Sequence, residues 1–370
     1  MRIFVSISIT QLNKGKVQDN TFKLPDSSFF KLARSSTFSI AIESTPFIHP
    51  TPNTLSQRDR LSKPKIKASN KPPQANGAWP IIGHLHKLSG TGLPHMTLGA
   101  MADQYGSAFT IQLGTKQALV VSSWKVAKEC FTTNDRALAS RPTHTTMALS
   151  RLPPIVSTGV KYTLLLGASD TTMVTLTWTL SLFLNNPHVF KKAQEELMAQ
   201  VGNDQHVDES DIKNLVYLQA IIKETIRLYP PAPLSAPREA IEDGVVVGYH
   251  VPVGMRVIAN LWKIQRDPSI WDDPLEFQPE RFLTTYKGID VWGQHYELIP
   301  FGYGRRSCPG IALALQVVQL ILAQLLHGFE LIRPSGAPVD MTESVGLTNV
   351  KVTLVEVLLA PRFPPQLYEA

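Results

Sequence analysis

A cysteine near the C-terminal end stands in a context that could activate it. Cys308 lies in the run FGYGRRSCPG, residues 301–310, and a long apolar segment follows at once. If that segment is a helix, the dipole and free N–H groups of its N-terminus favour the thiolate over the thiol. Such a sulfur can ligate a haem iron and push electron density onto it. Gly304 and Gly310 would let the backbone approach a flat macrocycle, and Arg306 could pair with a propionate.

Three other interpretations of Cys308 are a buried structural thiol, a tyrosine-phosphatase loop and a cysteine-protease nucleophile. A phosphatase loop places Arg six residues after its cysteine, but residue 314 is Ala. A protease needs a poised histidine and a recognisable local signature, and neither is present. For an isolated cysteine the structural interpretation would prevail, and here the ten-residue context argues against it.

The apolar run from Tyr162 to Leu184 carries a second group of reactive side chains. Asp170 and Thr171 lie near its centre, within the sequence GASDTT. Asp170 would cost about 2.5–3.5 kcal/mol in a membrane-spanning helix, so a helix buried in a protein core is favoured. Thr and Asp inside a helix compete for backbone hydrogen bonds, which indicates either a loosened turn or a satisfied core cluster.

A third group consists of charged residues. Glu224 and Arg227 are three residues apart on a predicted apolar helix, so they share a face and can pair. The segment Pro279-Glu280-Arg281-Phe282 follows downstream. Surface helices often carry such pairs, and the spacing alone is a weak signal.

The elements that must position these residues are mostly helical. Periodicity and breakers predict helices over Trp124–Phe131, 162–184, from Pro187 to Val201, over the segment with Leu218 and Ile226 that ends at Pro230, and over 311–329. Short strands are predicted around 245–247 and 256–259, and a hairpin at Gly114-Thr115 within 108–121. The last helix is apolar but contains three glutamines, which favours a place inside a protein.

Composition excludes two classes of protein. The net charge is +6, but residues 1–71 hold 12 basic against 4 acidic residues, so the rest of the chain carries −2. A nucleic-acid surface would need its positive charge spread over a folded face, and we expect no binding to DNA or RNA. Two cysteines, Cys130 and Cys308, cannot form a disulfide framework or a four-thiolate zinc site.

Residues 1–71 form a basic leader rich in Ser and Thr. This composition is typical of an organelle transit peptide, and it also fits a disordered segment or an error in the gene model. The leader has no apolar stretch long enough for a membrane-spanning helix, and we expect the chain not to be integrally anchored. A hinge rich in Pro and Gly follows from Pro72.

The segment 301–310 resembles the cysteine signature of the cytochrome P-450 superfamily, Phe-x-x-Gly-x-Arg-x-Cys-x-Gly, at every fixed position. Agreement with this superfamily is nearly continuous from Tyr162 onward, and the sequence there is similar to plant microsomal enzymes of the family numbered eighty-two. The resemblance implies a mainly α fold with small β-sheets (α+β), with haem b held by Cys308 as the axial iron ligand. The other residues implied to bind the cofactor are Arg306, Phe301, Gly304, Gly310 and Arg238.

The resemblance also assigns the other two groups. Asp170 and Thr171 match the oxygen-binding helix, where an acid and an alcohol relay protons to dioxygen, although Ala168 replaces a preferred Gly. Glu224, Arg227 and Arg281 match a structural triad that locks the loop beneath the haem. An NADPH-dependent reductase would supply electrons for inserting one oxygen atom from O₂ into a small lipophilic plant metabolite.

The chain departs from the family between Arg141-Pro142 and the oxygen-binding helix, where a long helical region is expected to be absent. Ser150 is joined almost directly to Arg151-Leu152-Pro153 at this point, which we call the junction near residue 150. We also expect the N-terminal membrane anchor of the family to be absent. The expected organisation is the leader 1–71, an N-terminal β-rich part 72–150 and a haem-binding helical core 151–370. Two functions remain open: an active monooxygenase, or a non-catalytic truncated fragment or pseudoenzyme. The family implies the surface of the endoplasmic reticulum membrane; a plastid or a soluble cytoplasmic fragment is the alternative.

Overall fold

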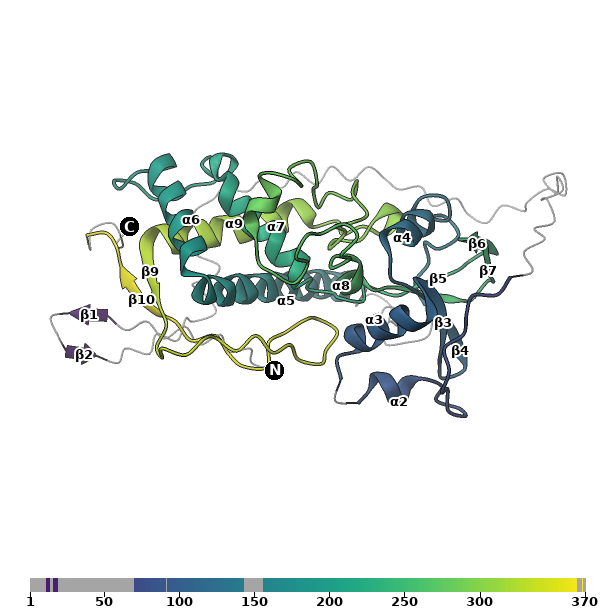
Figure 1. Ribbon diagram of the computed structural model, residues 1–370. Coiled ribbons are helices and arrows are strands. Elements are labelled where there is room, and N and C mark those ends of the chain that lie inside the picture. Colours follow the sequence, from purple (N-terminus) through teal and green to yellow (C-terminus); the bar gives the residue numbers. More distant parts are fainter. Residues whose placement is uncertain are drawn as a thin grey trace.

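The computed structural model describes residues 70–90, 92–142, 156–364 and 368, together with 11–13 and 16–18. Helices dominate these residues, and the strands form small sheets (Figure 1). The predicted class, mainly α with small β-sheets, is therefore confirmed.

The largest sheet has four strands in the order β3-β4-β8-β5. Strands β3 (Ala108–Leu113) and β4 (Lys116–Val121) form an antiparallel hairpin, with Gly114 in the left-handed region at the predicted turn. Strand β8 (Arg256–Ala259) runs parallel to β4, and β5 (Arg238–Glu239) pairs antiparallel with β8. The predicted hairpin and the strand at 256–259 are confirmed. This sheet joins segments from both sides of the junction near residue 150.

Three two-stranded ladders complete the β structure. Strand β6 (Gly244–Val246) pairs with β7 (Tyr249–Val251), and β9 (Phe329–Ile332) pairs with β10 (Leu358–Pro361). Strands β1 (Gln11–Asn13) and β2 (Lys16–Gln18) form a hairpin inside the leader. The expectation of a disordered leader stays a prediction; for residues 1–10, 14–15 and 19–69 it lies outside the described residues.

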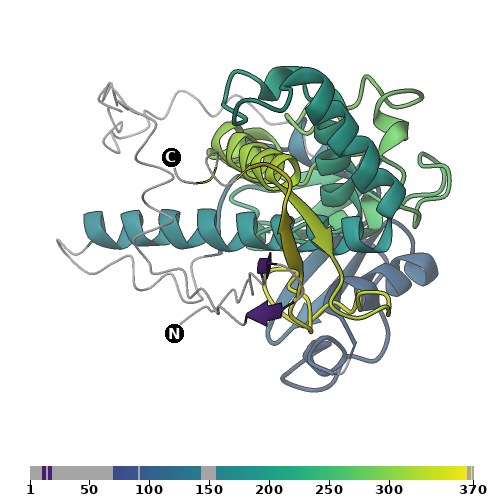
Figure 2. The same cartoon turned by 90° about the vertical axis from the view of Figure 1, so that its left-hand side faces the viewer.

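Four long helices form the main core. They are α5 (Val156–Asn185), α6 (Pro187–Gln200), α7 (Val216–Leu228) and α9 (Ile311–Gly328). Pro187 occupies the first turn of α6, because a proline there loses no helical hydrogen bond. Buried side chains from all four helices meet in one cluster that includes Phe183, Leu197, Leu218 and Leu322. Figure 2 shows α5 extending beyond this bundle at its N-terminal end.

The smaller helices lie mostly in the first half of the described chain. They are α2 (Leu85–Leu88), α3 (Pro94–Tyr105), α4 (Trp124–Phe131) and α8 (Leu261–Ile264), with single 3₁₀ turns η2 (Ile212–Asn214), η3 (Pro279–Phe282) and η4 (Gly304–Arg306). Helix α4 is confirmed, whereas α3 is absent from the sequence prediction. Within the described residues, α9 alone is long and apolar enough to cross a membrane. Core helices pass the same test, and α9 packs against α5, α6 and α7.

The segment between β9 and β10 returns to the N-terminal part of the molecule. In Figure 1 it runs below α5 and reaches α3. There Nε2 of His95, on α3, lies 2.9 Å from Oε2 of Glu343, and both side chains are buried. Lys351, in the part of the segment that leads back to β10, donates to the carbonyl oxygen of Asp340, in the part that comes from β9. This hydrogen bond holds the two parts of the segment together. A buried ionisable pair therefore links helix α3 to the segment between β9 and β10.

A buried charge cluster joins α7 to the loop around η3. The carboxylate of Glu224 accepts two hydrogen bonds from Arg227, at 2.7 and 2.9 Å, and one from Nε of Arg281 at 3.0 Å. The backbone N–H of Gln278 also donates to it, at 3.0 Å. Glu224 and Arg227 have no exposed surface, and Arg281 is 5% exposed.

The other N–H groups of Arg227 and Arg281 donate hydrogen bonds to backbone carbonyls of the loop. Arg227 donates to Gln265, Pro274 and Glu276, and Arg281 donates to Asp272, Asp273 and Glu276. A buried charge is tolerated when it is paired and fully hydrogen-bonded. The cluster therefore fixes the course of residues 265–281 against α7.

We predict that Glu224→Ala lowers the free energy of unfolding by about 3–5 kcal/mol, because two buried guanidinium groups lose their counter-charge. Denaturant unfolding of the full chain measures this. Glu195→Ala is the matched control, since Glu195 also pairs with a basic residue of its own helix, at 3.9 Å from Lys191, but is 65% exposed. Its cost should stay below about 1 kcal/mol. Equal costs for the two variants would contradict a structural role of the buried cluster.

Candidate functional site

The predicted cysteine loop is a tight turn that ends at α9. The backbone N–H of Cys308 donates to the carbonyl of Phe301 at 2.8 Å, and that of Ser307 donates to Gly304 at 3.0 Å. Helix α9 begins at Ile311 with Gly310 as its N-cap, so Cys308 lies two residues before the cap. The loop thus presents its sulfur beside the N-terminus of the long apolar helix.

The glycines of the loop serve two different needs. Gly304 has φ +65°, in the left-handed region, and a Cβ built on it would lie 2.2 Å from Oδ1 of Asp135. No other residue fits there without displacing that carboxylate. A Cβ on Gly310 would meet only the sulfur of Cys308, at 3.9 Å, among the described atoms within 4 Å. The backbone beside the sulfur is therefore open to a close approach.

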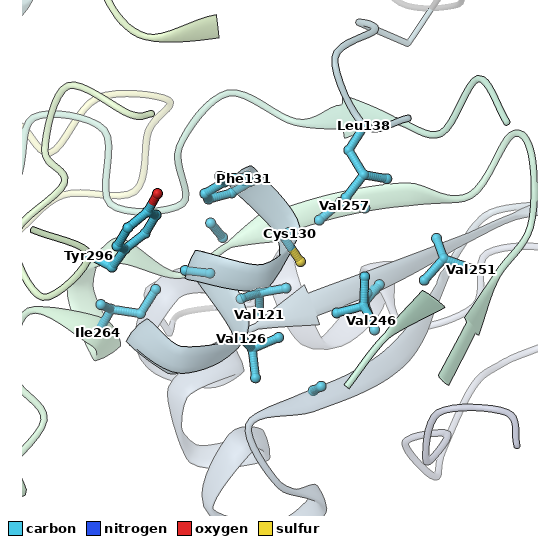
Figure 3. Packing of buried hydrophobic residues seen from close by; sticks show 14 of the residues in the cluster. Val121, Val126, Cys130, Phe131, Leu138, Val246, Val251, Val257, Ile264 and Tyr296 are labelled. Atoms are coloured by element: carbon cyan, nitrogen blue, oxygen red, sulfur yellow. The ribbon is translucent and has the colours of Figure 1, made fainter. Parts of the chain in front are cut away.

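The two cysteines lie in contrasting surroundings. Cys130 is fully buried between α4 and the four-stranded sheet, among Val121, Val126 and Leu138 (Figure 3). Burial raises the pKa of the Cys130 thiol to about 12, which keeps it protonated. Cys308 is half-buried, and both thiols are free of disulfides. Cys130 is thus a packing residue, and Cys308 is the accessible sulfur.

The arginines predicted to bind the cofactor make protein contacts near the loop. Arg306 donates from Nε to the carbonyl of Ala139. Arg238 donates to the carbonyl of Tyr303 at 2.6 Å and pairs with Asp135 at 3.3 Å. Burial lowers the pKa of the Arg238 guanidinium, and the carboxylate of Asp135 opposes that effect. Arg306 is exposed, which leaves its terminal N–H groups accessible.

Apolar side chains at the start of α9 continue the site beyond the loop. Phe301, Ile311 and Leu315 pack against a buried cluster that contains Trp271, Phe282 and Leu298. The same cluster includes Ala220 and Ile226 of α7, so the helix that carries the Glu224 cluster also supports the cysteine loop. Leu313 faces outward and is 56% exposed. The first turns of α9 thus combine a supported face with an exposed apolar face.

Asp170 and Thr171 lie in a continuous stretch of α5. Thr171 donates its hydroxyl proton to the carbonyl of Gly167 at 2.8 Å, and Thr175 donates to the carbonyl of Thr171 at 3.0 Å. Asp170 and Thr171 are both half-buried. The hydroxyl oxygen of Thr171 keeps its acceptor capacity while its proton is held by the helix. Of the two alternatives, a loosened turn or a satisfied core cluster, the structure shows no break, since α5 is continuous over Val156–Asn185 and both threonine hydroxyls are bonded within it.

Sequence reasoning missed one residue that touches the site. Asp135 accepts from the backbone N–H of Arg305 at 3.2 Å and pairs with Arg238, although it comes from the turn after α4. A lone acid in the run Thr-Asn-Asp-Arg carries no signal of its own. The constraint on Gly304 is visible in the sequence only as a glycine, and its cause is visible only in three dimensions.

The residues around Cys308 fit the haem that the resemblance implies. The loop offers one accessible soft sulfur, a backbone without side-chain cover at Gly310, and an apolar flank from α9. Thiolate is a ligand that haem iron takes. Arg306 is an exposed cation beside this surface, and Arg238 is a buried one.

Comparison with known proteins identifies relatives for most of the chain. The family model for cytochrome P450 matches residues 72–155 and 160–355. Strychnine-10-hydroxylase from Strychnos nux-vomica is 35% identical, over 80% of this chain and 92% of the relative. Xanthotoxin 5-hydroxylase CYP82C4 from Arabidopsis thaliana is also 35% identical, over 82% and 96%. The likeness to family eighty-two is therefore confirmed.

A solved structure supports the fold. A zebra fish cytochrome P450 with abiraterone superimposes with a TM-score of 0.62 at 22% identity, and the match covers 73% of this chain and 99% of that one. At this identity the likeness concerns the fold alone.

The alignments also bear on the predicted missing region. The alignment with the Strychnos enzyme spans 485 positions, but 80% of 370 residues is about 296, so about 190 positions hold residues of the relative alone. The two pieces of the family match meet at 155 and 160, beside the predicted junction. With the signature loop and the match on both sides of this junction, the chain belongs to the cytochrome P450 family, a family of haem-dependent monooxygenases.

Proposed function

We propose that this chain is a haem-thiolate monooxygenase that inserts one oxygen atom from O₂ into a small lipophilic plant metabolite, with electrons from an NADPH-dependent reductase. The observation that carries the proposal is the half-buried, free thiol of Cys308 on a pinned loop at the start of α9. The hydroxylase names of the plant relatives support the same reaction class.

Haem would supply the redox chemistry when bound, and a thiolate ligand would tune it by donating electron density. Cys308 would ligate the iron, and Gly310 would give the backbone room beside the macrocycle. Gly304, where a Cβ would meet the carboxylate of Asp135, would serve the shape of the loop instead. Phe301, Ile311 and Leu315, which pack against the buried cluster beside the loop, would supply apolar contact. Arg306, with Arg238 behind it, would neutralise propionates.

Asp170 and Thr171 would handle protons on α5. The Thr171 oxygen can accept a hydrogen bond from a water, because its own proton is directed to Gly167. Asp170 lies next to it and can exchange protons with solvent, being half-buried. The pair would thus hold a proton donor in place while the helix keeps its regular hydrogen bonds.

The relatives favour a specialised metabolite as substrate. Their names refer to strychnine and xanthotoxin, which share a rigid, largely apolar ring system. By the same analogy we place the protein at the surface of the endoplasmic reticulum, where its reductase would lie; a plastid location is the alternative.

A non-catalytic fragment is the second candidate function. It is favoured by the roughly 190 aligned positions that this chain lacks and by the exposed Leu313 on an apolar helix. Helices that are absent cannot cover the side chains that would otherwise pack on them. Exposed contiguous apolar surface beyond a few hundred Å² marks an interface or an aggregation liability.

We predict that Cys308→Ala abolishes the carbon monoxide difference spectrum of thiolate-ligated iron in haem-loaded protein. The reason is that Cys130, the other sulfur, is enclosed in the core and protonated. Cys130→Ala should retain the spectrum and serves as the matched control. Persistence of the spectrum in both variants would contradict the assignment of the ligand.

Thr171→Ala should divert reducing equivalents to hydrogen peroxide, with product formed per NADPH falling about tenfold or more, as expected when a positioned proton donor is lost. Thr177→Ala is the control, because Thr177 makes the same type of bond within α5, to Met173 at 2.8 Å. Unchanged product per NADPH in the Thr171 variant would assign this residue to packing.

We predict that the purified chain binds less than one haem per molecule and turns over far more slowly than a full-length relative. A free energy of unfolding of about 5–15 kcal/mol leaves little margin when large side chains lose their partners. Size-exclusion chromatography with haem quantification tests this. A monodisperse monomer with one haem per chain and sustained NADPH-dependent oxidation would reject the fragment alternative.

A further inference from the structure

The carboxylate of Asp135 is a contact point between the turn after α4 and the cysteine loop. Its two oxygens lie 3.3 and 3.2 Å from the backbone nitrogen of Arg305, and Oδ2 lies 3.5 Å from Nε of the same residue. The Asp135 side chain is only 14% exposed, whereas that of Arg305 is 68% exposed. The hydrogen bond to the backbone amide therefore provides most of the stabilisation in this contact, since an exposed side-chain ion pair contributes little.

Asp135 also orders a second tie to the loop. Arg238, on β5, pairs with Oδ1 of Asp135 at 3.3 Å and donates to the carbonyl of Tyr303 at 2.6 Å. Its guanidinium carbon lies 4.2 Å from the centre of the Phe131 ring. Loss of the carboxylate would leave a 4%-exposed guanidinium without its counter-charge, and it would then reorient or draw in water. The bond to Tyr303 depends on Asp135 for this reason.

Two interactions act on residues 303–305, which precede Cys308 in the sequence: Asp135 accepts from the Arg305 amide, and Arg238 donates to the Tyr303 carbonyl. Tyr303 is held through its carbonyl and Arg305 through its amide, and Gly304 between them has no room for a side chain against Asp135. Gly304 then accepts from the N–H of Ser307, next to Cys308. Asp135 does not contact Cys308 in any interaction found among the described residues. Its effect on the sulfur must pass through the backbone of this turn.

We propose that Asp135 is a positioning residue for Cys308: it fixes the Tyr303–Arg305 turn in the geometry that sets the sulfur, and it orients Arg238. The part concerning iron ligation rests on the proposed function. The mechanical part concerns the loop itself and applies before haem binds, because every contact named above is made by the chain's own atoms.

Amide hydrogen exchange in the full chain, before haem is added, tests the mechanical part. In Asp135→Ala we expect exchange of the Cys308 and Ser307 amides to rise at least about tenfold, the effect of losing one charge-assisted hydrogen bond on a local opening. These amides bond to Phe301 and Gly304, neither of which donates to Asp135. Alkylation of Cys308 by iodoacetamide should accelerate in parallel, while Cys130 stays unreactive.

Two further variants separate position from stability. Asp135→Asn keeps an oxygen for the Arg305 amide but removes the charge that holds Arg238, and we expect an intermediate effect; it also serves if the alanine variant does not fold. Asp103→Ala removes an exposed acid that pairs with Lys263 at 2.7 Å and should leave loop exchange unchanged.

An increase confined to the Arg305 amide would overturn the proposal, because the carboxylate would then protect only the group that it touches. An equal increase at the core amide of Leu322 in α9 would overturn it too, because the loss would be global. Neither result depends on haem, so failure here is distinguishable from failure of the proposed function, which the Cys308→Ala spectrum tests separately.

Discussion

The carboxylate of Glu224 has no exposed surface, and its charge is tolerated only because two guanidinium groups and one backbone amide surround it. Moving such an ion out of water costs several kcal/mol, and pairing with full hydrogen bonding recovers that cost. The arginines in turn bind the carbonyls of a loop that has little regular structure of its own. Residues 265–281, which have little regular secondary structure, are thereby held in one conformation.

That loop supports the site indirectly. Trp271, within the loop, and Phe282, directly after it, pack in the same cluster as Phe301, Ile311 and Leu315. Charge pairing at α7 therefore sets the surface on which the cysteine loop rests, while Asp135 and Arg238 hold the loop from its other side. The sulfur is placed by two separate sets of interactions, one mainly apolar and one ionic, that come from distant parts of the chain.

Local sequence patterns predicted the parts of this arrangement that are encoded locally. The cysteine loop, α9, α6 and the β3–β4 hairpin follow from glycine, proline and periodicity within short windows. Helix α5 begins at Val156, earlier than the apolar run predicts, and no proline stands between Pro154 and Tyr162 to prevent it. Helix α3 was missed because its inward face includes His95, whose partner Glu343 lies near the other end of the chain. Asp135 was missed for the same physical reason: its meaning depends on Arg305, far away in sequence.

The four-stranded sheet has a consequence for the junction near residue 150. Strands β3 and β4 precede it, β8 and β5 follow it, and the β4–β8 ladder joins the two sides in parallel. The entropy of closing a connection changes by only about 0.6 kcal/mol for each doubling of its length, so a shortened crossover leaves this ladder nearly unaffected. The sheet, the Asp135 contacts and the His95–Glu343 pair all cross the same boundary. The segments before and after the junction are thus two halves of one interface, the geometry on which complementation between separately made fragments relies.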